Sequence, residues 1–231
     1  MKKIAIIPAR GGSKRILRKN CKDFLGKPII AYSIESAIKS RLFDEIIVST
    51  DDMEIAEIAR NYGAKVPFMR SAKNSDDFST TVDVILEVLN WYAEIGEKYT
   101  IGTCIYACSP FVTSELLIQS DSLINNYKAD CVFPVIEYSH PIQRALILDQ
   151  SNKISPIESV NNESRTQDFV KSYHDAGMFY TFDVLSLFKN RSLRTENTYS
   201  IPLSQMNSQD IDTFEDWKIA EIKYKLLYED L

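Results

Sequence analysis

The chain has 231 residues, of which 45% are hydrophobic and 26% charged, so it can bury the core of one large domain and lacks the composition of a disordered protein. Its formal net charge of −5 argues against a broad nucleic-acid-binding surface. No run approaches the roughly 20 apolar residues of a membrane span, and the apolar run Ile4 to Pro8 is too short for a signal peptide. We therefore expect no nucleic-acid or membrane partner and a cytoplasmic location.

The four cysteines support the same compartment. They form no CxxC pair and have no histidine near them in sequence, which argues against a zinc site and against a disulfide framework. Free thiols are the default in a reducing cytosol. Three of them lie in or beside predicted strands, where we expect buried small hydrophobes: Cys104, Cys108 and Cys131.

Strands and helices alternate along the first part of the chain. The segments 4–7, 45–50, 64–69, 101–106 and 131–136 are short apolar runs typical of strands buried on both faces. Helical spacing or capping signals predict helices over 28–38, 53–62, 80–94 and 113–125. This alternation predicts an α/β fold with a doubly wound, mostly parallel sheet.

The pattern changes after Glu137. Residues 138–176 are polar, with weak periodicity and several turn-forming residues, and we interpret them as an insertion of short strands and loops that acts as a lid or a dimer arm. Regular elements resume with strands over 177–182 and 199–203 and helices over 184–188 and 214–228. The chain is thus a single domain, 1–231, with an insertion at about 138–176.

A basic, glycine-containing loop follows the first strand. Residues 1–22 hold eight Lys and Arg and no acid, and in an open parallel sheet ligands bind at the carboxyl ends of the strands. Gly11 and Gly12 permit unusual backbone angles and an inward-turned anion nest. Arg10, Lys14 and Lys19 can neutralise a triphosphate. Neither the Walker A nor the GxGxxG pattern is present, and the alternative is a merely solvated basic loop.

Two carboxylates near the end of the chain are candidates for the other half of the site that the basic loop begins. Asp210 and Asp212 are two residues apart, so in an extended segment they project from the same face. Such a pair suits Mg²⁺, which accepts one or two carboxylates together with waters and substrate phosphates. The competing interpretation is that Asp212 caps the terminal helix, with Glu215 completing a capping box.

Several ordered motifs together resemble one family. These are IAIIPARGGSKRILRKN at 4–20, FLGKPI at 24–29, IIVSTDD at 46–52, Arg70 with Ser75-Asp76, and Asp210-Ile211-Asp212-Thr213. They resemble the sugar-activating cytidylyltransferases, especially CMP-sialic acid synthetases, over nearly the whole chain. The resemblance implies a Rossmann-like nucleotidyltransferase fold, CTP as a substrate, a metal role for both aspartates, and a homodimer.

The resemblance also implies roles for single residues. Arg10 and Lys14 would meet the triphosphate, and Lys19 would stabilise charge at the α-phosphate. Asn20 would touch the cytosine, and Thr80 keeps the hydroxyl of the Ser often found at its position. The implied nucleotide-binding set is Gly11, Gly12, Ser13, Asn20, Arg70 and Thr80.

The sugar-facing residues point to a particular acidic sugar. Tyr106 stands where relatives that use N-acetylneuraminic acid carry Gln, and the blocks 140–144, 164–168 and 173–177 look like those of pseudaminic acid cytidylyltransferases. This resemblance implies that Arg144 or Arg165 would bind the sugar carboxylate with a bidentate contact. The residues implied to bind polar substituents are Gln143, Gln167 and His174.

The expected reaction is CTP-dependent activation of a nonulosonic acid, with pseudaminic acid as the substrate, to its CMP-sugar with release of pyrophosphate. The same reaction on N-acetylneuraminic, legionaminic or 3-deoxy-manno-octulosonic acid is the nearest alternative. A non-catalytic nucleotide-binding protein is the alternative from another class, and the joint presence of Arg10, Lys19, Asp210 and Asp212 counts against it.

Overall fold

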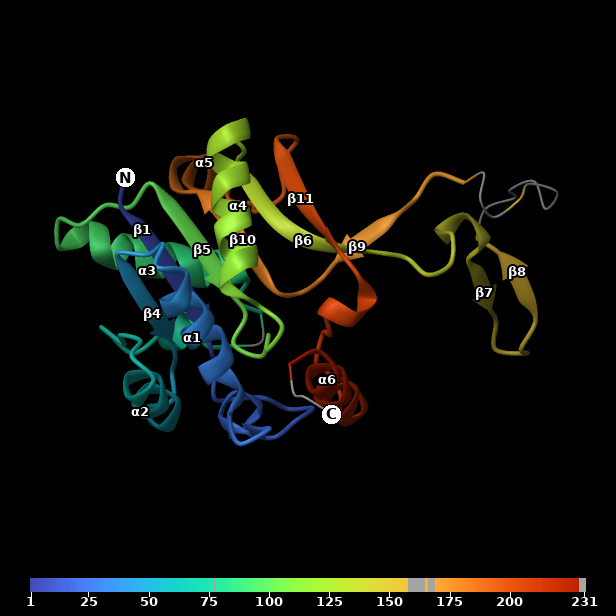
Figure 1. Ribbon diagram of the computed structural model, residues 1–231, viewed down its shortest axis with the longest axis horizontal. Coiled ribbons are helices and arrows are strands. Elements are labelled where there is room, and N and C mark those ends of the chain that lie inside the picture. The colour runs from blue at the N-terminus through green and yellow to red at the C-terminus, as the bar shows by residue number, and fades with distance from the viewer. Residues whose placement is uncertain (77, 158–164, 166–168, 229–231) are drawn as a thin grey trace.

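The computed structural model describes residues 1–76, 78–157, 165 and 169–228, and within them a seven-stranded sheet forms the centre of the molecule (Figure 1). Six of its strands follow the spatial order β11-β6-β10-β5-β1-β4, and β9 pairs with β6. The strands are β1 (Lys3–Pro8), β4 (Glu45–Ser49), β5 (Ile101–Ile105), β6 (Cys131–Glu137), β9 (Tyr173–Asp175), β10 (Phe179–Asp183) and β11 (Thr198–Leu203).

The sheet is mainly parallel, as predicted. β1 runs parallel to β4 and β5, with Ile6 opposite Ile47 and Cys104, and β11 runs parallel to β6. β10 is inserted between β5 and β6 and is antiparallel to both. Its direction follows from the chain path, because the insertion leaves the carboxyl end of β6 and returns to the sheet at that same edge.

Helices cover both faces of the sheet. One apolar core packs α1 (Ile29–Ser40), α2 (Met53–Asn61) and α4 (Ser114–Tyr127) against the sheet and also includes α6 (Phe214–Tyr228), whose Trp217 and Tyr224 pack on Phe24. The other packs α3 (Thr81–Glu94) and α5 (Val184–Asn190). In β1, Ala5 and Ile7 face the first core while Ile4 and Ile6 face the second, which is why the segment 4–7 is apolar at every position. No helix among the described residues has the length and apolarity to cross a bilayer.

Short elements complete the body. β2 (Asp23–Phe24) and β3 (Lys27–Pro28) form a small antiparallel pair before α1. Single turns of 3₁₀ helix lie at Lys19–Cys21, Ala72–Asn74, Ile142–Arg144 and Gln205–Asn207.

The predicted strand over 64–69 is wrong. Lys65 exchanges backbone hydrogen bonds with Ile46 and Val48 at 2.8 and 2.9 Å, and the ladder goes no further. Pro67 has no N–H to continue it, and the chain turns so that Arg70 donates its backbone N–H to Thr50. This segment therefore borders β4 without extending the sheet.

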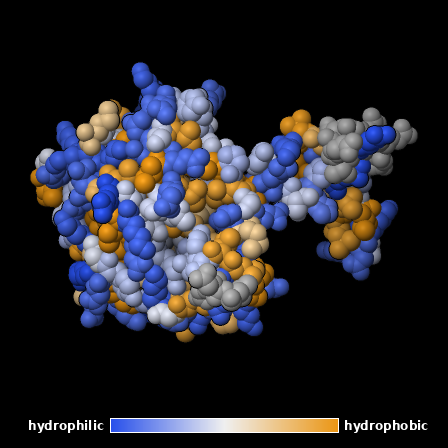
Figure 2. All heavy atoms as spheres, in the orientation of Figure 1, coloured by the Kyte–Doolittle hydropathy of each residue, from blue (hydrophilic) through white to orange (hydrophobic). Residues whose placement is uncertain are grey.

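The insertion forms an arm that projects from the body (Figures 1 and 2). At its far end β7 (Leu146–Leu148) and β8 (Ile154–Pro156) form an antiparallel hairpin, which confirms the prediction of short strands. Every residue of β7 and β8 is exposed in this chain, including Leu146, Leu148 and Ile154. The hairpin thus presents apolar side chains that the body of its own chain does not cover.

Candidate functional site

A cavity of about 550 Å³ opens at the carboxyl edge of the sheet. Its walls come from the loop after β1, the residues after β5, the turn before β10 and the segment between β11 and α6. Because β10 is antiparallel, its amino end reaches the same edge as the carboxyl ends of its neighbours. The described lining residues are Pro8, Arg10, Ser13, Lys14, Arg15, Ile16, Lys19, Asn20, Tyr106, Ala107, Cys108, Ser109, Gly177, Asp210, Ile211 and Asp212.

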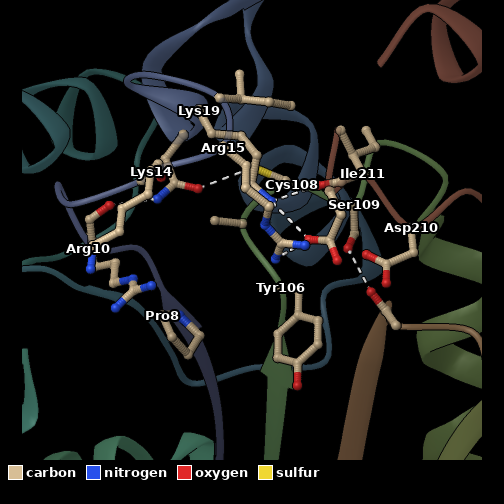
Figure 3. A pocket seen from close by; sticks show the side chains of 16 residues that line it. Pro8, Arg10, Lys14, Arg15, Lys19, Tyr106, Cys108, Ser109, Asp210 and Ile211 are labelled. Carbon is tan, nitrogen blue, oxygen red and sulfur yellow. Dashed lines mark hydrogen bonds and ion pairs between the residues drawn. The ribbon is translucent and has the colours of Figure 1, made fainter. Parts of the chain in front are cut away.

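The structure brings the two ends of the chain together in this cavity (Figure 3). Lys19 donates from Nζ to the carbonyl of Ile211 at 2.6 Å, and its Nζ lies 3.8 Å from Asp212 Oδ1. Arg15 forms a closer ion pair with the same oxygen, at 2.8 Å. Predicted triphosphate ligands and predicted metal ligands therefore belong to one site, as the sequence suggested.

Arg10 and Lys14 line the same cavity beside this cluster. Arg10 also donates from Nη1 to the carbonyl of Asp76 at 3.3 Å, which ties the loop to the segment before α3. With Arg15 and Lys19 they place four basic side chains around a space that an anion of triphosphate size can enter.

The two glycines of the loop act differently from the prediction. Neither has a positive φ, so neither is needed for an unusual backbone angle. Gly11 is needed for space, because a Cβ there would lie 2.6 Å from Asp52 Oδ2, whereas a Cβ on Gly12 would meet nothing within 4 Å. The Gly11 amide donates to Asp51 at 2.9 Å, and the Ser13 amide to the Gly11 carbonyl at 3.0 Å. The Gly11 amide, one of the two predicted nest donors, is therefore turned to a protein acceptor, and anion binding by the Gly12 amide stays a prediction.

Asn20 lies at the floor of the cavity and is buried. Its amide group donates to the carbonyl of Arg10 at 2.9 Å, and its oxygen accepts from Cys108 Sγ at 3.0 Å. These bonds fasten the basic loop to the residues after β5. A contact with the cytosine base stays a prediction.

Cys108 differs from the other two cysteines expected to be buried. Cys104 and Cys131 are buried in the core, whereas Cys108 lies in the cavity wall. Burial raises the pKa of the Cys108 thiol to about 12, so it is a neutral hydrogen-bond donor to Asn20 and not a nucleophile at neutral pH.

Asp210 and Asp212 both face the cavity. The surrounding protein raises the pKa of Asp210, by desolvation first and by the negative charge of Asp212 second, with Lys19 acting in the opposite direction. The ionised pair is thus electrostatically costly without a cation close to both carboxylates.

The capping interpretation of Asp212 is wrong by one residue. Thr213 accepts the Asp216 amide at 3.2 Å, and Asp216 accepts the Thr213 amide at 2.7 Å, which is a capping box one position later than Asp212 and Glu215. Asp212 contributes its backbone N–H to Asp216 at 3.1 Å, and its carboxylate is left to face Arg15 and Lys19.

These two carboxylates fit a magnesium ion. Hard oxygen donors, a raised Asp210 pKa and an adjacent cavity large enough for phosphates suit a cation that binds through few protein ligands. No group of three or more His, Cys, Asp or Glu side chains in the described chain could hold a metal by itself. A metal at this pair would take its remaining ligands from phosphate and water.

Four predicted nucleotide residues lie outside the cavity lining, namely the loop glycines Gly11 and Gly12 together with Arg70 and Thr80. Arg70 is buried and donates from Nε to Ser49 Oγ at 3.0 Å, and it also bonds the Ser49 carbonyl, so it braces the end of β4. Thr80 caps α3 in a capping box with Asp83. Arg70 and Thr80 both hold elements beside the loop, and direct nucleotide contact by either stays a prediction.

Tyr106 lines the cavity, whereas the other predicted sugar residues that the structure describes lie along the arm and its base. Gln143 donates to the Val170 carbonyl at 3.4 Å, and Arg144 lies over the Phe169 ring at 5.7 Å. Arg165 is exposed, and His174 packs on the Tyr138 ring with a centroid distance of 4.9 Å. Gln167 falls outside the described residues. The structure thus does not bring Gln143, Arg144, Arg165 or His174 into the cavity of their own chain.

Sequence reasoning assigned no site role to several lining residues, and three of them make or shape contacts in the cavity: Arg15, Ser109 and Gly177. Arg15 was counted only as part of the basic segment, although it forms a closer ion pair with Asp212 than Lys19 does. Ser109 follows a buried strand at its carboxyl end, which is the signal that could have identified it. Gly177 lies at the start of a strand whose reversed direction was not predicted, so its position at this edge carried no sequence signal.

Comparison with known proteins shows which family the chain belongs to and which solved structures share its fold. The family model for cytidylyltransferases matches residues 4–217. A pseudaminic acid cytidylyltransferase of Campylobacter jejuni is 39% identical over 229 residues, 99% of each chain, and a CMP-N,N′-diacetyllegionaminic acid synthase of Legionella pneumophila is 31% identical over 96% of this chain and 95% of that protein. The solved structure of CMP:2-keto-3-deoxy-manno-octonic acid synthetase complexed with CTP covers 100% of both chains with a TM-score of 0.70 at 17% identity, and so shares the fold.

Proposed function

This chain belongs to the cytidylyltransferase family, and on that premise we propose that it transfers CMP from CTP to a nonulosonic acid, with pseudaminic acid as the substrate. The observation that carries the proposal is the joining of the basic loop to Asp210 and Asp212 in one cavity. The 39% identity to a pseudaminic acid cytidylyltransferase over the whole chain supports the sugar. The 31% identity to the legionaminic acid enzyme makes that sugar the second candidate.

The proposed chemistry is an in-line displacement at phosphorus. The anomeric hydroxyl of the sugar acid forms a bond to the α-phosphorus of CTP, the bond from that phosphorus to the β-phosphate oxygen breaks, and pyrophosphate leaves. The hydroxyl proton passes to solvent. Such a reaction needs positioning and charge stabilisation more than covalent catalysis.

The basic residues supply that stabilisation. We propose that Arg10 and Lys14 hold the β- and γ-phosphates and that Lys19 faces the α-phosphate, because Lys19 is fixed between the loop and the aspartates by its bond to Ile211. Arg15, which pairs with Asp212, adds positive charge at the same place. Among the cavity residues described, no histidine is placed to act as a general base.

We propose that Asp210 and Asp212 hold Mg²⁺. When bound, the ion neutralises the triphosphate and makes the α-phosphorus more electrophilic. The two carboxylates would hold the ion on the side of the cavity where Lys19 and Arg15 lie, and those two side chains would add positive charge for the phosphates. The raised pKa of Asp210 supports this role, because a bound cation would offset both the desolvation that mainly raises it and the repulsion by Asp212 that adds to it.

We further propose that the arm makes a homodimer. The exposed apolar residues of β7 and β8 need a partner surface, and a second copy of the chain is the partner that the family resemblance implies. The predicted sugar residues on the arm, Gln143, Arg144 and Arg165, would then serve the partner's cavity. Four free thiols and CTP as substrate favour the cytoplasm as the place of reaction.

Pyrophosphate release tests the reaction. The purified chain is mixed with CTP, Mg²⁺ and each of pseudaminic, legionaminic, N-acetylneuraminic and 3-deoxy-manno-octulosonic acids, and the CMP-sugar is identified by mass spectrometry. We expect the largest kcat/KM with pseudaminic acid. A larger value with another acid would refute the sugar assignment, and no release with any acid would favour the non-catalytic nucleotide-binding protein.

Light scattering after size exclusion tests the arm. We expect twice the chain mass of 26.4 kDa. A variant in which Leu146 and Leu148 are both replaced by Ser should shift the mass to one chain. A single-chain mass for the unaltered protein would contradict the dimer.

A further inference from the structure

The turn over residues 175–177 connects three walls of the cavity. Ala176 accepts a hydrogen bond from Ser208 Oγ at 3.2 Å, and Gly177 accepts one from Ser109 Oγ at 3.3 Å. Ser109 belongs to the residues after β5, and Ser208 lies between β11 and α6. The turn before β10 is therefore fastened to both neighbouring segments of the site.

One oxygen of the Asp175 carboxylate shapes this turn. Asp175 Oδ1 accepts the backbone N–H of Gly177 at 2.9 Å. Gly177 has a φ of +64°, a left-handed conformation that favours glycine, and a side-chain-to-backbone bond of this kind holds such a turn. A Cβ at Gly177 would lie 3.4 Å from the carboxyl carbon of Asp210, so the turn forms the wall against which Asp210 packs.

The other oxygen of the same carboxylate binds side chains next to Tyr106, the predicted sugar residue that lines the cavity; we call this the sugar side. Asp175 Oδ2 accepts from the Tyr180 hydroxyl at 2.5 Å and from Arg194 Nη2 at 2.9 Å. The Tyr180 ring packs edge-on against the Tyr106 ring, with the centroids 5.7 Å apart. It also contacts the Phe133 ring, at a centroid distance of 5.3 Å. Tyr106 itself lines the cavity.

The Asp175 side chain is only 19% exposed and does not line the cavity among the described residues. Burial raises the pKa of Tyr180 far above its ordinary value, so its hydroxyl stays protonated and donates to Asp175. Asp175 thus has the geometry of a residue that acts through others.

We propose that Asp175 is a positioning residue that sets the metal side and the sugar side of the cavity with one carboxylate. Oδ1 places the Gly177 turn behind Asp210, and Oδ2 places Tyr180 and, through its ring, Tyr106. This inference rests on the proposed function for the identity of the two ligands. It predicts that the contact made by Oδ1 affects the binding of CTP with Mg²⁺, whereas the contacts made by Oδ2 affect the binding of the sugar acid.

Three variants separate these effects. Tyr180→Phe removes the bond to Oδ2 and leaves the Gly177 turn. Asp175→Asn keeps an oxygen acceptor for Gly177 but puts an amide donor where Tyr180 and Arg194 donate, so it should resemble Tyr180→Phe. Asp175→Ala removes both. The matched control is Asp183→Ala, because Asp183 accepts the Ser186 amide at 2.7 Å and holds a turn at the opposite end of β10, away from the cavity.

The measurements are the KM for pseudaminic acid, the affinity for CTP in the presence of Mg²⁺ by calorimetry, and the melting temperature. For Tyr180→Phe and Asp175→Asn we expect the KM for the sugar acid to rise roughly tenfold with the nucleotide affinity unchanged. For Asp175→Ala we expect the magnesium-dependent CTP affinity to fall roughly tenfold as well. Asp183→Ala should lower the melting temperature and change neither constant.

The outcomes are distinguishable. A purely structural role would give Asp175→Ala a lower melting temperature with wild-type KM and wild-type CTP affinity, and that result overturns the proposal. If Asp175→Ala does not fold, wild-type sugar KM in both Tyr180→Phe and Asp175→Asn overturns it. If the unaltered chain releases no pyrophosphate with any sugar acid, the proposed function fails, and equal magnesium-dependent CTP affinities in wild type and Asp175→Ala would overturn the positioning role separately.

Discussion

Asp212→Asn separates catalysis from stability at one position. Asp212 does not cap α6, since Thr213 and Asp216 do so, and its carboxylate is engaged only with Arg15 and Lys19 in the contacts described. The side chains of Asp212 and Arg15 are 41% and 67% exposed, and an exposed pair of this kind contributes about 0–1 kcal/mol. Removing one of two neighbouring negative charges offsets part of that loss. We expect the melting temperature to change by less than about 3 °C.

Turnover should respond very differently to this substitution. If Asp212 helps to hold Mg²⁺ at the phosphates, its neutral amide should lower kcat by about 100-fold or more, the scale of losing one preorganised electrostatic contact. The matched control is Thr213→Ala, which removes the cap, costs about 1 kcal/mol and should keep kcat. For each variant, a continuous assay of pyrophosphate release measures kcat, and thermal unfolding measures stability. Turnover of Asp212→Asn within about threefold of wild type would refute the metal role.

Three further predictions follow from single contacts. Gly11→Ala should raise the KM for CTP by on the order of tenfold, because its Cβ would lie 2.6 Å from Asp52 Oδ2, whereas Gly12→Ala should bind CTP as wild type does in the same titration. The folded-state pKa of Asp210 is raised, so its ionised form costs folding free energy at neutral pH, and that cost disappears as the pH falls through the folded pKa. Without metal, the melting temperature of Asp210→Asn at pH 7 should therefore be higher than that of the wild type. A difference between the two melting temperatures that does not narrow on acidification would contradict this. Phe24→Ala should cost about 3–5 kcal/mol in urea unfolding, since Phe24 is fully buried, and a loss below 1 kcal/mol would contradict the packing described.

Local patterns were sufficient for most of the fold. The apolar run at 4–7 and the helix over 80–94 appear where predicted, as β1 and α3, because burial on both faces and strong helical patterning are properties of the segment itself. The prediction of a strand over 64–69 failed because Pro67 has no N–H with which to continue the hydrogen bonds that Lys65 makes to β4, although the segment is apolar. The antiparallel direction of β10 depends on where the insertion re-enters the sheet, and no local pattern encodes that.

For the site, the residue types and the joining of the basic loop to the two aspartates could be predicted, and the individual contacts between them could not. The sequence by itself determined that a basic loop follows a strand and that two aspartates can share one face. Its resemblance to a family implied CTP as the ligand of the loop and a metal ion as the ligand of the aspartates. Only the tertiary structure decided that Arg15 meets Asp212, that Thr213 is the cap, and that Gly11 makes room for Asp52 without an unusual φ. The physical reason is that chemistry and patterning belong to single residues, whereas distances of about 3 Å between segments 190 positions apart depend on how the sheet and helices pack.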